Sequence, residues 1–133
     1  KRYNDKYGHP QGDKALRMVA DCILNSLRRP TDFAFRIGGE EFAIIICDQD
    51  LHETQQFLEG IRHKVEALEI PHSDSTVSGF VTLSIGAFWA PGSSNPDKTT
   101  LYAEADKALY LAKNTRNLCV VQNTMIEPAF SAA

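Results

Sequence analysis

The sequence has few cysteines and no excess of basic residues, and both shortages limit what the protein can be. Its three cysteines, Cys22, Cys47 and Cys119, are unevenly spaced and form no C-x-x-C pair. They predict reduced core thiols of a cytosolic protein, without a disulfide framework or zinc site. Lysine and arginine number 14 against 17 acidic residues, a formal net charge of −3. Domains that bind nucleic acid usually carry a clear basic excess, so no such partner is expected.

Long hydrophobic runs are also missing. The longest uninterrupted apolar stretch is Phe42 to Cys47, well short of the roughly 20 residues of a membrane span. No signal-peptide pattern is present. We therefore expect a cytoplasmic domain without membrane contact of its own. The chain starts at Lys1 rather than Met, so we expect it to be cut from a longer protein, which could be membrane-anchored upstream.

Hydrophobic spacing divides the chain into alternating helices and strands. Helical spacing recurs in three segments, which start near Pro10 or Asp13, near Leu51 and after the loop at 91–97. Strands are expected at 33–37, 41–47, 80–89 and 118–121. This order predicts one α/β sandwich, a mixed sheet with helices packed on it. The chain after Gln122 has no periodicity, which divides it into a domain at 1–123 and a tail at 124–133.

The stretch RIGGEEFAIII, Arg36 to Ile46, places two carboxylates at a glycine corner. Gly38 and Gly39 predict a tight hairpin turn, and the apolar strand behind it should be covered on both faces. Glu40 and Glu41 are adjacent, so they should point to opposite faces. One or two carboxylates together with substrate phosphates suit Mg²⁺. The alternative is a charged hairpin tip that binds nothing.

Two further pairs of polar residues are candidates for ligand binding. Asn4 and Asp13, on either side of a Gly/Pro corner, offer the donor and acceptors that suit the edge of guanine. Their alternative roles are a turn former and a helix N-cap. Arg29 and Asp32 could bind an anion and its purine, or could simply end a helix and begin a turn.

The last helix should end with two cations, Lys113 and Arg116. Cations complement the dipole at a helix C-terminus, and these two could equally hold a triphosphate. The four histidines are scattered without metal-ligand spacing, so no zinc site is assigned to them.

Five segments together resemble a known family: K-R-Y-N-D-K-Y-G-H-P-Q-G-D, R-P-T-D, R-I-G-G-E-E-F, T-L-S-I-G and A-D-K-A-L-Y-L-A-K. In this order and spacing they resemble the GGDEF-domain family, the diguanylate cyclases, and G-G-E-E-F is one of the two usual active forms of its signature. The resemblance implies a mainly antiparallel sheet with packed helices, like the palm of nucleotide cyclases and polymerases. It also implies bacterial second-messenger signalling. Two GTP would condense into cyclic di-GMP and two pyrophosphates in a homodimer that needs Mg²⁺ or Mn²⁺.

The resemblance also implies roles for individual residues. Glu40 would bind the metal, and Glu41 would support the metal site or help to deprotonate the attacking hydroxyl. Arg29 and Asp32 match an R-x-x-D site at which the product, cyclic di-GMP, inhibits the enzyme. The substrate-binding residues would be Asn4, His9 and Asp13 at the guanine, with Gly38, Gly39, Lys113 and Arg116 at the phosphates.

The chain departs from the family pattern in three places. Family members have a strand before the position of Lys1 that carries an Asp ligand to the metal, so this chain should lack a central strand. We expect it to be inactive in this form, unlike its parent, in which an upstream domain would regulate it. A-K-N-T-R-N has no glycine and is one residue short, so Arg116 should not meet the phosphates in the usual way. A second product-binding arginine would fall at Gly60, and Arg62 is near but not equivalent.

Two functions besides catalysis remain open from the residues alone. The domain could sense cyclic di-GMP or GTP without turnover, or it could be a dimerising structural domain. Sensors of this family usually have a degenerate signature, and the signature here is intact, so the sequence favours an enzyme.

Overall fold

The computed structural model describes residues 1–123, so the expected tail at 124–133 lies outside the described residues. The described residues divide into two compact units. The first unit contains Lys1–Gln49 and His63–Thr82, and the second contains Asp50–Arg62 and residues 83–123. The helix α3 (Leu51–Glu66) crosses this division. No helix within residues 1–123 is both long and apolar enough to cross a membrane.

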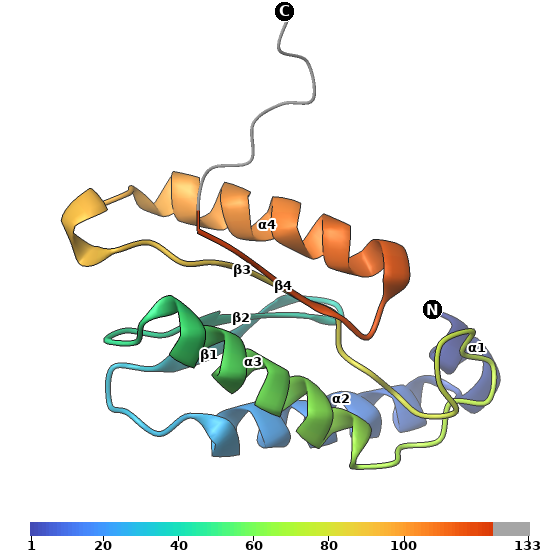
Figure 1. The fold of residues 1–133 in the computed structure, drawn as a ribbon. Helices are drawn as coiled ribbons and strands as arrows, with labels where there is room; N and C mark the ends of the chain where they lie inside the picture. The colour runs from blue at the N-terminus through green and yellow to red at the C-terminus, as the bar shows by residue number, and fades with distance from the viewer. Residues whose placement is uncertain (124–133) are drawn as a thin grey trace, which may run out of the picture. The chain divides into compact units, whose positions relative to one another are not determined.

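The first unit opens with a short helix joined directly to a long one (Figure 1). Helix α1 (Arg2–Tyr7) ends at Gly8, whose φ of 82° lies in the region that favours glycine. Helix α2 (His9–Ser26) begins at the next residue, with Pro10 in its first turn, where a missing N–H costs no hydrogen bond. The buried residues of α2 are Gly12, Ala15, Val19, Ile23 and Ser26, which follow the helical period.

The first unit also contains an antiparallel hairpin of β1 (Phe33–Gly38) and β2 (Glu41–Ile45). The predicted hairpin is therefore present, but its turn residues are Gly39 and Glu40 rather than the two glycines. The expected burial of the second strand on both faces is wrong for the described residues, because Ile45 is 50% exposed. Phe33 lies opposite Ile45 in the register and is exposed as well.

The second unit is built on a parallel pair of strands, β3 (Ile85–Phe88) and β4 (Cys119–Gln122). Helix α4 (Lys98–Thr115) connects them and lies along both strands (Figure 1). The contact is close: a Cβ atom added to Gly86 would lie 2.0 Å from the backbone nitrogen of Leu109. Ala108 and Ala112 of α4 are fully buried, so small side chains permit this approach.

The observed order of helices and strands matches the prediction, and the α+β class is confirmed. The described strands form two separate two-stranded sheets, one antiparallel and one parallel, instead of one continuous sheet. The strand expected at 80–89 is shorter than predicted, because its partner β4 has only four residues with which to form a ladder. Phe80 forms only an isolated bridge with Pro71.

Candidate functional site

The hairpin tip carries the two candidate carboxylates. Gly39 has a φ of 53°, in the left-handed region that suits glycine, and Glu40 follows it in the turn. Glu41 is the first residue of β2 and pairs with Gly38. The structure thus brings both glutamates to one tight turn, where both are exposed. No atom lies within 4 Å of a Cβ added at Gly38 or Gly39, so there is open space beside the turn for a ligand.

An arginine that sequence reasoning did not select braces this turn. The Nε of Arg36 donates a hydrogen bond to the carbonyl oxygen of Gly39 at 2.7 Å. The register of the hairpin shifts between Arg36 and Gly38, which marks a bulge at the end of β1. Arg36 therefore holds the backbone from which Glu40 and Glu41 extend. In the sequence Arg36 is a single charge in an apolar strand, so no local pattern marks it as a contact of the turn.

The structure places Asn4 beside the start of α2. A Cβ atom added to Gly12 would lie 1.8 Å from Oδ1 of Asn4, so the Asn4 side chain rests on the backbone of Gly12. Asp13 is the next residue in the helix, and His9 lies four residues before Asp13, on the same helix face. The structure thus places Asn4 against the residue before Asp13, and both His9 and Asp13 are exposed.

Arg29 and Asp32 are also close. The backbone N–H of Arg29 donates to Oδ2 of Asp32 at 3.2 Å. The Nη1 of Arg29 donates to the carbonyl oxygens of Cys47 at 3.0 Å and Asp48 at 2.5 Å, which fixes the guanidinium against the chain after β2. Asp32 is buried, and within residues 1–123 its Oδ1 has no hydrogen-bond partner. That oxygen is enclosed by protein, so an N–H of a ligand could reach it only after the surrounding chain had moved.

Lys113 and Arg116 belong to the second unit, so their joint use with the hairpin stays a prediction. Lys113 lies in the last turn of α4 and is exposed. Arg116 caps that helix with a φ of 63°, a conformation that a glycine would adopt more easily. The arginine thus occupies a strained backbone position, which agrees with the missing glycine noted in the sequence.

Arg62 is occupied by neighbours within the second unit. Its Nε and Nη2 donate to Oε2 of Glu59 at 3.0 and 2.8 Å, and its Nη1 donates to Oδ1 of Asn117 at 2.8 Å. The Arg62 side chain is only 13% exposed. That Arg62 is not the equivalent of a second product-binding arginine stays a prediction.

The cysteines show no sign of catalytic activation. Burial is the main reason that the pKa of Cys119 is raised to about 11, with the negative charge of Glu59 adding to it. Burial also raises the pKa of Cys22. A protonated thiol is a poor nucleophile. The prediction that all three are core residues is wrong for Cys47, which is exposed.

The residues at the hairpin fit a hard divalent cation only in combination with a substrate. Among the described residues no three His, Cys, Asp or Glu side chains form a group that could hold a metal ion by themselves. Glu40 and Glu41 supply carboxylate oxygens in an open position. Mg²⁺ is commonly bound by one or two carboxylates, with phosphates and water completing its shell, and this donor set fits that arrangement.

Comparison with known proteins identifies the family. The family model for the diguanylate cyclase GGDEF domain matches residues 1–118. The chain is 39% identical over 127 residues to the probable diguanylate cyclase DgcT of Escherichia coli K12, covering 94% of this chain and 27% of DgcT. It is 38% identical over 115 residues to the diguanylate cyclase VdcA of Vibrio cholerae, covering 86% of this chain and 33% of VdcA.

Solved structures of GGDEF domains resemble this chain as well. The GGDEF domain of DgcB from Caulobacter crescentus, solved in complex with c-di-GMP, superposes with a TM-score of 0.76 at 34% identity, covering 90% of this chain and 69% of that one. The active GGEEF domain of a diguanylate cyclase from Vibrio cholerae superposes with a TM-score of 0.67 at 25% identity, covering 91% and 74%. The chain belongs to the GGDEF-domain family. It spans about a quarter to a third of the length of the curated relatives that it matches.

Proposed function

We propose that this chain is the catalytic domain of a diguanylate cyclase, which converts two GTP molecules into cyclic di-GMP and two pyrophosphates. The observation that carries the proposal is the hairpin turn at Gly39, after which the adjacent residues Glu40 and Glu41 are both exposed. Relatives that are named as diguanylate cyclases support it. A GTP-dependent reaction and three free thiols suit the cytoplasm.

Substrate binding divides between a base and a phosphate end. Asn4 and Asp13 offer the donor and acceptors that match the guanine edge, with His9 on the same helix face as Asp13. The open space beside Gly38 and Gly39 accepts the phosphates. We assign Lys113 and Arg116 to the binding of the phosphates. The assignment of Arg116 has less support, because its backbone is strained.

The chemistry is a displacement at phosphorus that occurs twice. In each step the 3′-oxygen of one GTP bonds to the α-phosphorus of the other, the bond to the bridging oxygen breaks, and pyrophosphate leaves. Glu40 and Glu41 would hold Mg²⁺ or Mn²⁺, which when bound neutralises charge on the phosphates and acidifies the hydroxyl. We assign to Glu41 the acceptance of the proton from the attacking hydroxyl. Since each domain holds one GTP, a homodimer is required.

Product feedback is the proposed role of Arg29 and Asp32. Arg29 is exposed, its guanidinium is held by the carbonyl oxygen of Cys47, and its backbone N–H contacts Asp32, so the two residues of the R-x-x-D pair lie together. The DgcB domain solved with c-di-GMP supports this class of ligand. An Arg29→Ala variant should keep its initial rate and lose inhibition by added cyclic di-GMP. Unchanged inhibition would contradict this role.

A sensor that binds cyclic di-GMP without turnover is the second candidate, and the contact between Arg29 and Asp32 is the observation that favours it. The test is to incubate the natural full-length protein with GTP and Mg²⁺ and to measure cyclic di-GMP by chromatography. Wild type should form product, while Glu41→Gln should form none but still bind cyclic di-GMP. Binding of cyclic di-GMP by a wild type that forms no product would establish the sensor instead.

A further inference from the structure

Helix α1, which carries Asn4, cannot hold its position by itself. It has six residues, no buried side chain and no side-chain hydrogen bond at its N-terminal cap. Isolated helices shorter than about 12 residues are marginal in water even with favourable sequences. The placement of Asn4 therefore depends on what α1 contacts elsewhere. Asn4 itself rests on Gly12 of α2, which supports only one side of the helix.

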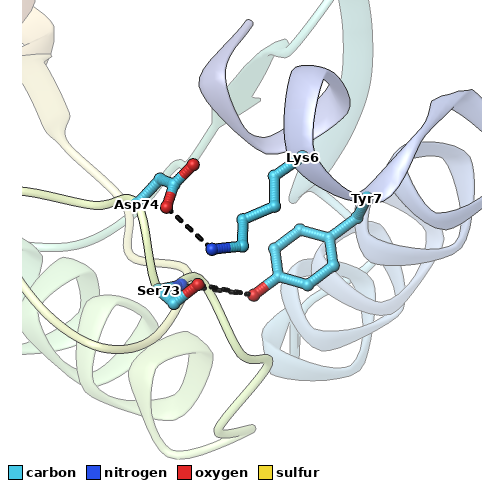
Figure 2. A network of polar contacts seen from close by, with 4 residues as sticks. All are labelled: Lys6, Tyr7, Ser73 and Asp74. Carbon is cyan, nitrogen blue, oxygen red and sulfur yellow. Dashed lines mark hydrogen bonds and ion pairs between the residues drawn. The ribbon is translucent and has the colours of Figure 1, made fainter.

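A loop that is distant in sequence contacts α1 at several points. Lys6 Nζ and Asp74 Oδ1 form an ion pair at 2.9 Å. The hydroxyl groups of Tyr7 and Ser73 lie 3.2 Å apart, and the backbone N–H of Ser73 donates to the Tyr7 oxygen at 3.3 Å. Figure 2 shows the two side chains of α1 reaching across to adjacent residues of one loop. We call these four residues the α1 clamp.

A ring contact extends the clamp along the helix. Tyr3 packs edge-on against His72 with ring centroids 5.4 Å apart, and Tyr3 and Tyr7 lie 4.7 Å apart. Tyr3 and Tyr7 are four residues apart, so they share one face of α1. Asn4 is turned about 100° from Tyr3. The loop thus contacts one face of α1, while the Asn4 side chain extends from another face and contacts Gly12.

The loop is itself anchored. The backbone N–H of His72 donates to the carbonyl oxygen of Gly79 at 2.8 Å, and that of Val81 donates to Ile70 at 2.8 Å. Ile70 is buried. These hydrogen bonds join the two ends of the loop, so the loop has a fixed backbone against which α1 can pack. A contact to a fixed support sets the rotation of a short helix about its axis.

The α1 clamp contributes little to the free energy of folding, so its main effect is on the position of α1. The side chains of Lys6 and Asp74 are 41% and 51% exposed, and exposed ion pairs add little stability. The hydrogen bond to Asp74 raises the pKa of Lys6, and the hydrogen bonds of Ser73 lower the pKa of Tyr7, as expected for contacts that favour the charged forms. Loss of the clamp should thus leave the fold intact and let α1 shift.

We propose that Lys6, Tyr7, Ser73 and Asp74 are positioning residues for nucleobase recognition, which hold α1 so that Asn4 meets the guanine edge. The inference rests on the proposed function, in which Asn4 reads guanine. It adds that the loop at 72–79, remote in sequence from every motif of the site, sets how strictly the domain selects its base.

The test compares GTP with inosine triphosphate, which lacks the 2-amino group of guanine, in the natural full-length protein. The Asn4→Ala variant serves as the reference for complete loss of the preference for GTP over inosine triphosphate. The double variant Tyr7→Phe with Asp74→Asn should raise KM for GTP about three- to tenfold, as expected for one weakened hydrogen-bonding group. Its KM for inosine triphosphate and its kcat should change less than about twofold. Thr76→Ala, exposed in the same loop, is the matched control and should behave as wild type.

A charge swap separates positioning from general destabilisation. Lys6→Asp should reduce the preference for GTP, and Lys6→Asp combined with Asp74→Lys should restore it. A clamp variant that weakens both nucleotides equally would overturn the inference and indicate a purely structural contact. If wild type makes no product, or if Asn4→Ala leaves discrimination intact, the proposed function itself fails. If Asn4→Ala loses discrimination and the clamp variants keep it, only the clamp is rejected.

Discussion

Oδ1 of Asn4 lies 1.8 Å from the position that a Cβ of Gly12 would occupy. The two residues are eight positions apart and belong to different helices, α1 and α2. This contact places the side chain that we predict to bind guanine against the residue before Asp13. Any side chain at Gly12 would have to displace Asn4.

The Gly12→Ala substitution should therefore weaken recognition of GTP. The added methyl group moves the Asn4 amide, and loss of its hydrogen bonds should raise KM for GTP about tenfold, with little change in kcat. Steady-state kinetics provides the measurement. In an Asn4→Ala background the same substitution should have almost no further effect, because the clash is gone. Full additivity of the two changes would contradict the contact.

Arg36→Ala should lower kcat/KM about tenfold, because the turn that carries Glu40 and Glu41 loses the 2.7 Å hydrogen bond from Arg36 to Gly39. The measurement is cyclic di-GMP production against Mg²⁺ concentration, and a higher Mg²⁺ requirement is expected. Arg17→Ala, at an exposed position of α2, is the charge-matched control. Equal activity of the two variants would show that Arg36 has no role at the turn.

Gly86→Ala should destabilise the second unit by at least about 2 kcal/mol, because its Cβ would collide with the backbone of α4 at Leu109. Urea unfolding measures the change in free energy. Gly60→Ala, within helix α3, is the control, since no atom lies within 4 Å of the added Cβ. It should be neutral or stabilise by up to about 1 kcal/mol. Similar midpoints for the two variants would contradict the packing of β3 on α4.

Stability should fall as the pH drops below 6.5, in part through His72. Burial lowers the pKa of His72 from its ordinary value of 6.5, with Asp74 opposing the shift. The unfolded chain then binds a proton more readily than the folded one in the window just below pH 6.5. Urea midpoints measured from pH 7.5 to 5 should decline less steeply for His72→Gln than for wild type. An equally steep decline in His72→Gln and wild type would contradict this contribution of His72.

Local sequence patterns predicted the helices and strands well where interactions between residues close in sequence determine them. The hairpin at RIGGEEF was predictable because glycine accepts the φ of 53° found at Gly39. The buried face of α2 was predictable because Val19 and Ile23 follow the helical period. The strand expected at 80–89 was too long, because the length of a ladder depends on the partner strand, here β4.

Contacts between distant segments were not predictable from the sequence. In the α1 clamp, Tyr7 and Ser73 are separated by 66 positions in the sequence, and Lys6 and Asp74 by 68. No local sequence pattern marks such pairs. Arg36 was missed for another reason. Its position in an apolar strand indicates an exposed charge, and the hydrogen bond to the Gly39 carbonyl occurs next to a register shift that the sequence does not mark.

The central claim, catalysis by the hairpin carboxylates, is tested most directly by the stoichiometry of the reaction. The natural full-length protein is incubated with GTP and Mg²⁺, and cyclic di-GMP and pyrophosphate are measured in the same sample for wild type and Glu41→Gln. We predict two pyrophosphates for each cyclic di-GMP in wild type, and neither product with Glu41→Gln. Undiminished synthesis by Glu41→Gln, or a wild type that binds GTP and releases no pyrophosphate, would contradict the account.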